Sequence, residues 1–423
     1  MAKSTVHQNP ITLIIPIIPA NVDLLREDLK KIKQDLKDGR KNYFSDIHTI
    51  HYARWIIIDD KDEIGNPDHE SAKLIFSSNF DGSIEDQLRD LCTISANITD
   101  HIYQNCVGYP EKHLRTPEAR MNYLKQWNVP AASFYRGSPN RSLDQIRKES
   151  KLRNHLRNFL DQRNWDNFTS KQVQQKLKDE VKSNSEFRWA EEPFKMPGIN
   201  WIGMIITGII LIIISPLVII LILIIQFFYE RKDTYFTLKR NELDEKRMQE
   251  LEKDEDFEFQ NQFTQLVSMK PGKLRLFTFN FMMLFSKVLI KFLFVKGKLM
   301  GIPSIHFARW VVFDDNKRVL FCSNFDGSWQ QYLGDFIDKS GWGLTGIFSN
   351  TTNFPKTKFL FFGGAYDEEH FLAWSRNTEL PTQVWYNAYP ELSIKNVNNN
   401  SLIRSLLFKN LSEKKAEDFL KLI

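Results

Sequence analysis

One stretch of this chain occurs twice, and the repeat constrains the fold more than any other feature. Residues 50–83 read IHYARWIIIDD, a polar insertion and KLIFSSNFDGS, and residues 305–328 read IHFARWVVFDDNKRVLFCSNFDGS. The match continues without a gap between 134–153 and 385–404. Internal repeats indicate duplicated structural units. We therefore expect two copies of one domain.

Each copy has the same predicted order of elements. Apolar runs at 11–19 and 264–271 predict a buried first strand, and a helical pattern follows each run. The repeated signature supplies two strands and a second helix, and a further strand lies near the end of each copy. The order strand, helix, strand, strand, helix, strand is the ferredoxin-like plan, an antiparallel sheet covered by helices on one face. Two such units can cover each other's open faces. The predicted fold is therefore α+β, with tandem ferredoxin-like units forming a pseudo-dimeric α+β barrel.

The domain boundaries follow from the repeat and from changes in composition. We place the first ferredoxin-like unit at 1–160 and the second at 261–423. Between them lie a charged helical extension (161–200), an apolar membrane segment (201–229) and a charged linker helix (230–260). Charged runs of mixed sign are typical of solvent-exposed helices, so we assign no chemistry to them.

Composition argues against several classes of protein. The 57 Lys and Arg residues nearly balance 52 Asp and Glu residues, which does not favour nucleic-acid binding. Cys92, Cys106 and Cys322 have no metal-like spacing, so neither a zinc site nor a disulfide framework is expected. The motifs of P-loop nucleotide binding, of serine hydrolases and of zinc proteases do not occur.

Residues 201–228 contain no charged side chain and are long enough to cross a bilayer. The N-terminus does not resemble a secretory signal, so residues 1–200 are expected in the cytoplasm. A single span would place the two copies on opposite sides of the membrane. Because Pro216 divides the segment, we favour a hairpin of two half-helices that leaves both halves facing the cytoplasm. The alternative is a kinked single span, with halves of different chains pairing in a homo-oligomer.

The predicted first helix of the second unit, 274–296, is unusually apolar, with lysines and arginine at its edges. This pattern is typical of a helix at a membrane interface. The alternative is a buried core helix.

The polar residues of the signature are the candidate site. Side chains alternate along a strand, so His306, Ala308 and Trp310 are predicted on one face and Phe307 and Arg309 on the other. The candidate catalytic residues are the polar side chains of both signatures: His306, Arg309, Asp326, His51, Arg54 and Asp81.

Two interpretations of these residues remain open. In the first, Arg309 and Asp326 form a structural bridge, and Ser328 caps the helix that follows. In the second, the histidine and arginine face a cavity, where imidazole binds a metal or haem iron and guanidinium binds an anionic or peroxidic ligand.

The duplicated architecture resembles the dimeric α+β barrel superfamily, which includes chlorite dismutases and dye-decolourising peroxidases. This resemblance implies haem as the cofactor and His306 as the residue that binds it. The match to the peroxidases is incomplete, because FDGS at 325–328 retains only the final D-G of their G-x-x-D-G motif.

The whole chain more closely resembles an uncharacterised family of bacterial membrane-associated proteins. The resemblance rests on IHFARW (305–310), SNFDGSW (323–329), a glycine pair before an acidic helix (363–369) and PTQVWY (381–386). It implies the architecture alone.

These patterns predict a membrane-attached α+β barrel protein that acts as an oxidoreductase, haem-dependent or similar, on a lipid-like or other apolar substrate. The alternative is a non-catalytic lipid-binding or scaffold protein at the membrane surface. The expected partners are the lipid bilayer and an apolar small molecule.

Overall fold

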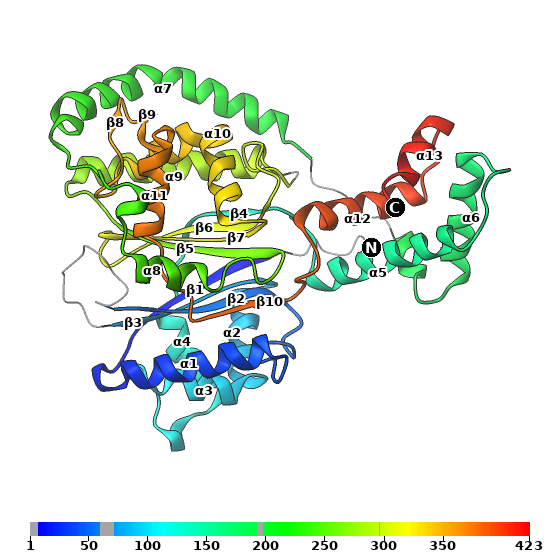
Figure 1. Ribbon diagram of the computed structural model, residues 1–423, viewed down its shortest axis with the longest axis horizontal. Coiled ribbons are helices and arrows are strands. Elements are labelled where there is room, and N and C mark those ends of the chain that lie inside the picture. The colour runs from blue at the N-terminus through cyan, green and yellow to red at the C-terminus, as the bar shows by residue number, and fades with distance from the viewer. Residues whose placement is uncertain (1–6, 60–71, 193–197, 296) are drawn as a thin grey trace.

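The computed structural model describes residues 7–59, 72–192, 198–295 and 297–423. These residues form a mixed α+β fold in which two four-stranded antiparallel sheets face each other, with helices on the outer sides (Figure 1). The first sheet has the order β1 (Gln8–Pro16), β3 (Lys73–Asp81), β2 (Ile50–Ile58) and β10 (Val384–Asn387). The second has the order β4 (Ala131–Arg136), β6 (Ile305–Phe313), β7 (Arg318–Asp326) and β5 (Gln260–Ser268).

Helices cover the outer face of each sheet (Figure 1). Those on the first sheet are α1 (Val22–Lys37), α2 (Ile84–Thr93), α3 (Ala96–Tyr103) and α4 (Pro117–Gln126). Those on the second are α9 (Lys273–Phe292), α10 (Trp329–Phe348) and α11 (Glu368–Asn377), beside the small hairpin β8 (Thr357–Lys358) and β9 (Phe362–Gly363). The segment between the units carries α8 (Glu245–Glu252). Separate apolar cores lie under each helical layer, and a third lies between the sheets.

The two copies exchange their fourth strands. β10, from the second copy, pairs with β2 from Val384↔Trp55 to Asn387↔Tyr52. β4, from the first copy, pairs with β6. Each sheet therefore takes three strands from one copy and one strand from the other. This differs from the expectation that the first 160 residues and residues 261–423 each complete a unit.

Both signature strands contain a β-bulge at the same place. The register shifts between Ile50 and Tyr52 in β2, and between Ile305 and Phe307 in β6. His51 and His306 are therefore the additional residues of the two bulges. A bulge locally disrupts the ladder and redirects side chains.

A helical arm extends to one side of the sheets (Figure 1). It consists of α5 (Leu143–Asp161), α6 (Ser170–Ser183), α12 (Ile394–Leu407) and α13 (Glu413–Leu420). These helices share an apolar core of their own. The predicted extension 161–200 is thus only part of a larger element that also includes the C-terminal helices.

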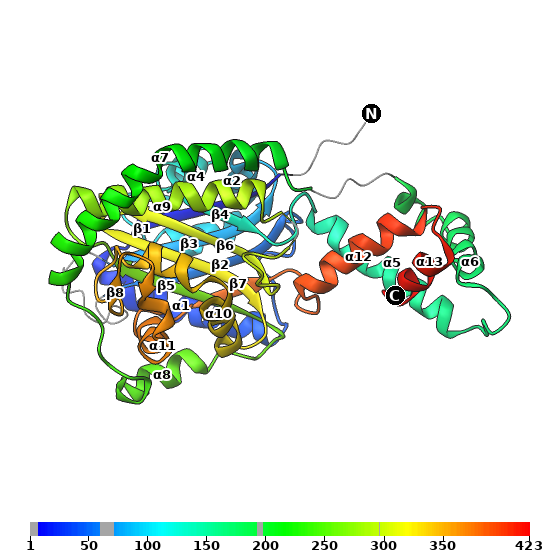
Figure 2. The ribbon, with the colours of Figure 1, turned by 90° about the horizontal axis from the view of Figure 1, so that it is seen from above.

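The apolar segment is one continuous helix, α7 (Trp201–Phe228). The predicted hairpin of two half-helices is wrong, because Pro216 lies inside the helix without ending it. Proline removes the N–H that would bond the carbonyl four residues earlier. Here the Ser215 hydroxyl donates to that carbonyl, of Ile212, at 2.8 Å. The helix runs beside α9 on the outside of the second unit (Figure 2).

The unusually apolar helix α9 ends at Phe292, four residues before the predicted end. One side of it packs into the core of the second unit, through Phe279, Met282 and Met283. Its other side leaves Phe277 and Leu284 exposed. The helix therefore combines the two alternatives, a core helix on one face and an exposed apolar surface on the other.

Candidate functional site

The bulges bring the predicted site residues of both copies into the layer between the sheets. His306 lies on the same side of β6 as Phe307, since both rings contact the Tyr52 ring, with centroids 5.6 and 5.8 Å away. Arg309 also reaches across to the first sheet. The predicted alternation is therefore wrong for His306, because the additional residue of the bulge shifts the side-chain order by one.

Arg309 joins the second sheet to the first. Its guanidinium donates to the carbonyl oxygens of Ile11 at 2.7 Å and Ser78 at 2.8 Å. It also donates to the Thr12 hydroxyl at 3.2 Å and to the side-chain oxygen of Asn79. Burial lowers the pKa of Arg309 to about 9. The predicted bridge between Arg309 and Asp326 is therefore wrong, because Arg309 bonds to the first sheet and Asp326 pairs with His306.

Arg54 makes the mirrored contacts from the first sheet to the second. Its guanidinium donates to the carbonyl oxygens of Phe263 at 3.1 Å and Ser323 at 2.8 Å. It also donates to the Thr264 hydroxyl at 2.8 Å and to the side-chain oxygen of Asn324. Burial lowers its pKa as well. Because each arginine is bonded to oxygens of the opposite sheet, the pair holds the two sheets together.

Each histidine pairs with the aspartate of its own copy. His306 Nε2 lies 2.7 Å from Asp326 Oδ1, and Asp326 Oδ2 accepts a hydrogen bond at 2.8 Å from the backbone N–H of Ile394, the first residue of α12. These contacts tie the bulge of β6 to the start of the arm helix.

The first copy repeats this arrangement. His51 Nε2 lies 2.9 Å from Asp81 Oδ1, and Asp81 Oδ2 accepts from the N–H of Leu143, the first residue of α5. The predicted helix cap at Ser328 is confirmed, because its hydroxyl accepts the N–H group of Gln331. In the first copy, the Ser83 hydroxyl accepts the N–H group of Asp86 in the same way.

One tyrosine breaks the symmetry of the two copies. The Tyr389 ring lies 5.8 Å from both His51 and His306, measured between ring centroids. It therefore lies near the pseudo-two-fold axis, where only one of two equivalent side chains has room. By the repeat alignment its counterpart in the first copy is the small Ser138. Tyr389 completes the packing between the sheets.

These residues do not fit a haem group. Haem iron needs an imidazole nitrogen directed at open space, and Nε2 of each histidine is held by an aspartate. The rings of Tyr52, Phe307 and Tyr389 fill the space beside them. In the described ranges, no three His, Cys, Asp or Glu side chains are grouped closely enough to hold a metal ion. The arrangement between the sheets supports structural roles for all six predicted residues.

A polar cavity of about 190 Å³ lies where α1, the segment before β5 and β10 meet. Lys33 and Lys37 of α1 enter it and both bind Asp254. Glu258 also lines it, and burial raises the pKa of this carboxyl group. Sequence reasoning missed this cavity, because its walls come from both copies and no local motif marks it.

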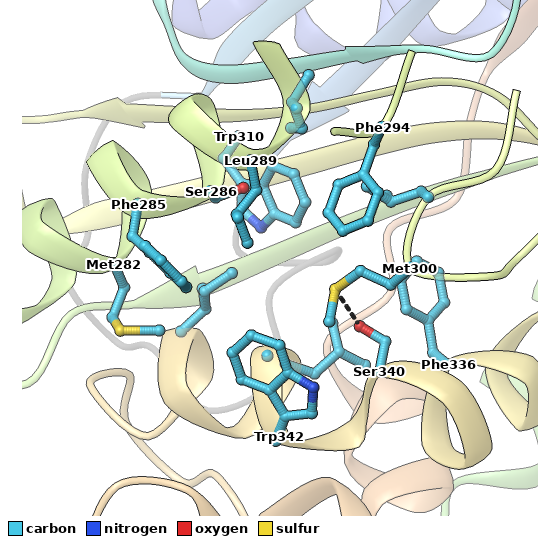
Figure 3. A pocket seen from close by; sticks show the side chains of 15 residues that line it. Met282, Phe285, Ser286, Leu289, Phe294, Met300, Trp310, Phe336, Ser340 and Trp342 are labelled. Carbon is cyan, nitrogen blue, oxygen red and sulfur yellow. Dashed lines mark hydrogen bonds between the residues drawn. The ribbon is translucent and has the colours of Figure 1, made fainter. Parts of the chain in front are cut away.

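A second cavity, of about 40 Å³, is almost wholly apolar and lies between α9 and α10 (Figure 3). Trp310 of β6 forms its base, and Phe285, Phe294 and Trp342 lie around it. Its polar groups include the Ser340 hydroxyl, which contacts Met300 Sδ at 2.9 Å. The only signal of it in the sequence is the apolar character of 274–296.

No family model, curated protein or solved structure matches this chain. We therefore classify the protein by its fold alone, as a mixed α+β protein with two antiparallel sheets that face each other. Within the described residues, one helix with the turn that follows it, Trp201–Lys232, is long and apolar enough to cross a membrane, by length and composition alone.

Proposed function

We propose that this protein binds a membrane surface and holds a lipid chain or another apolar molecule, without catalysing a reaction. The observation that carries the proposal is the exposure of α7. Ile202, Ile212 and Ile213 are 73%, 74% and 70% exposed, and most of the other apolar side chains of this helix are exposed as well. Exposed apolar patches of this extent are typical of membrane or protein contact sites. A bilayer would cover this helix.

The proposed architecture places both units on one side of the membrane. Each sheet contains strands from both copies, so the units cannot be separated by a bilayer without losing strand pairing. The strand orders β1-β3-β2 and β5-β7-β6, each completed by the fourth strand of the other copy, support a pseudo-dimeric α+β barrel of ferredoxin-like units. We place both units on the cytoplasmic side.

The cavity between α9 and α10 supports the ligand part of the proposal. An apolar cavity of about 150 Å³ in another protein takes up benzene, and this one has about 40 Å³. It therefore suits the end of a hydrocarbon chain whose remainder lies outside. α9 lines the cavity and lies beside α7 (Figure 2).

The oxidoreductase predicted from the sequence has less support. Its six candidate residues are bonded to one another or to backbone groups of the opposite sheet. No observation between the sheets favours a substrate there.

Vesicle flotation of the full-length chain tests the membrane attachment. We expect the wild-type protein to float with vesicles, and the double variant Ile212→Glu/Ile213→Glu to remain in the lower fractions with an unchanged melting temperature. Leu114→Glu, at an exposed apolar position of the first unit, is the control and should float. A wild-type protein that does not float, or a double variant that floats equally well, would contradict the attachment.

Binding of a fluorescent fatty acid tests the cavity. Leucine at Gly343, which lines the cavity, should fill it and reduce binding. The matched control is Gly334→Leu on the same helix, where a Cβ atom meets nothing within 4 Å. Equal binding by both variants would exclude the cavity as the site.

A further inference from the structure

We propose that α7, α9 and the β8–β9 hairpin form one docking face that selects bilayers containing anionic lipid, with the axis of α7 parallel to the membrane plane. This inference deepens the proposed membrane attachment and rests on it. It names the lipid class and the orientation, neither of which follows from an apolar helix alone.

Both ends of α7 are bonded to the second unit. At the start, the N–H of Asn200 donates to the carbonyl of Phe292 in α9 at 3.2 Å. Near the end, Gln226 accepts the N–H of Phe359 at 2.6 Å, in the loop between β8 and β9. One turn later, Glu230 accepts the N–H of Leu360 at 3.1 Å. The helix is therefore held at both ends against one surface.

This attachment excludes a transmembrane orientation for the docked helix. At about 1.5 Å per residue, α7 is about 42 Å long, whereas the hydrocarbon core is about 30 Å thick. A spanning helix would carry one end to the far side of the bilayer. That end would lose its contacts with α9 or with the hairpin. The docked helix instead lies lengthwise beside α9 (Figure 2), with most of its apolar side chains exposed.

Two segments that contribute to this face carry basic but no acidic residues, and the nearby Asp233, just after α7, is already paired with Lys270 and Arg275. Residues 259–313 contain eight Lys and Arg and no Asp or Glu, and residues 339–366 contain three Lys and no Asp or Glu. The exposed lysines of these ranges in α9, the loop after it and the hairpin with the residue before it are Lys273, Lys287, Lys291, Lys298, Lys356 and Lys358. The exposed charged side chains of α9, the loop after it and the hairpin are therefore all positive.

Apolar and cationic side chains share the same exposed stripes. Phe277, Leu284 and Lys291 are seven residues apart on α9, and a spacing of seven keeps side chains on one helical face. On the hairpin, the exposed Phe362 pairs across the strands with Lys358. An apolar centre with lysines at its border is the arrangement of proteins that lie in the membrane interface. A lysine near an anionic bilayer strengthens binding about five-fold.

Binding to two kinds of vesicle tests the lipid selectivity. The vesicles are phosphatidylcholine alone and phosphatidylcholine mixed with phosphatidylglycerol. We expect the triple variant Lys287→Gln/Lys291→Gln/Lys298→Gln to lose about 100-fold in affinity for the mixed vesicles and little for the neutral ones. The control is Lys414→Gln/Lys415→Gln/Lys421→Gln, in α13 and at the residue after it, which removes the same charge from the arm and should bind as the wild type does.

The outcomes separate this inference from the proposed function. Equal binding of the wild type to both vesicles, or unchanged binding of the Lys287/Lys291/Lys298 triple variant to the mixed vesicles, overturns the anionic selectivity while the attachment stands. Failure to bind either vesicle overturns both. Self-association through α7 in the absence of lipid, with no vesicle binding, would assign the face to a second copy of the chain instead.

Spin labels test the orientation. Labels on cysteines introduced at Ile202, Ile213 and Phe228, all exposed, should report similar shallow depths in the bilayer if α7 lies parallel to it. A depth profile with Ile213 far deeper than both ends would show a spanning helix and overturn the parallel orientation.

Discussion

Replacing Arg309 with methionine tests whether the signature arginines hold the two sheets together. Methionine keeps much of the side-chain volume but removes the donors to the carbonyls of Ile11 and Ser78. A hydrogen bond to a charged group contributes about 1.5–3 kcal/mol, so these two bonds contribute about 3–6 kcal/mol. The cost of burying the charged guanidinium offsets part of this contribution, and the same cost lowers the pKa of Arg309 to about 9. Because the carbonyls remain buried without that donor, we expect a net loss of about 3 kcal/mol.

Urea unfolding of the detergent-solubilised full-length chain, followed by tryptophan fluorescence, measures this loss. Arg54→Met should behave like Arg309→Met, because its contacts to the second sheet mirror those of Arg309. The exposed Arg157 on α5 provides the control, and Arg157→Met should shift the midpoint little. Losses below about 1 kcal/mol at both buried arginines would refute the structural role. Unchanged stability together with lost fatty-acid binding would instead indicate a ligand site.

Three further predictions follow from burial and close contact. The thiols of Cys92 and Cys106 should resist alkylation in the folded protein at pH 8, because burial raises the pKa of each to about 12; mass spectrometry that finds rapid labelling would contradict this. Burial raises the pKa of Glu379 from 4.5 to about 8, so the folded state keeps a proton that the unfolded state releases, and stability should fall as the pH rises from 4.5 to 8. Glu379→Gln should flatten that slope in thermal unfolding, and an unchanged slope would refute the assignment. Gly137→Ala should destabilise the protein by about 2 kcal/mol or more, because its Cβ atom would lie 2.1 Å from a backbone oxygen of β6; Gly334→Ala has no such contact and should not lower the melting temperature.

The signature strands were predictable because their pattern is local. β6 and β7 occupy 305–313 and 318–326, within the repeated stretch 305–328, and the cap at Ser328 was predictable from the residue types that follow the signature. The bulges were not predictable. The additional residue of a bulge, such as His306, has no distinct pattern in the sequence. In the structure, however, the bulge moves the imidazole to the opposite face of the strand.

The partners of the arginines were also beyond the sequence. Arg309 bonds to Ile11 and Ser78, which are 298 and 231 residues away along the chain. Nothing in the signature distinguishes these oxygens from the carboxylate of Asp326, the nearer and chemically plausible partner. The candidate site was therefore predicted with the correct residues but with different contacts.

The sequence by itself determined that this chain is duplicated and that it carries one long apolar segment, because both properties are patterns of side chains along the chain; that this segment is one continuous helix was decided only by the structure. The tertiary structure alone decided which copy completes each sheet and where α7 lies. Backbone hydrogen bonds are the same whichever copy supplies a fourth strand, so the choice depends on how the side chains of both copies pack between the sheets. The cavities also depend on the tertiary structure, because their walls come from segments that are far apart in the sequence.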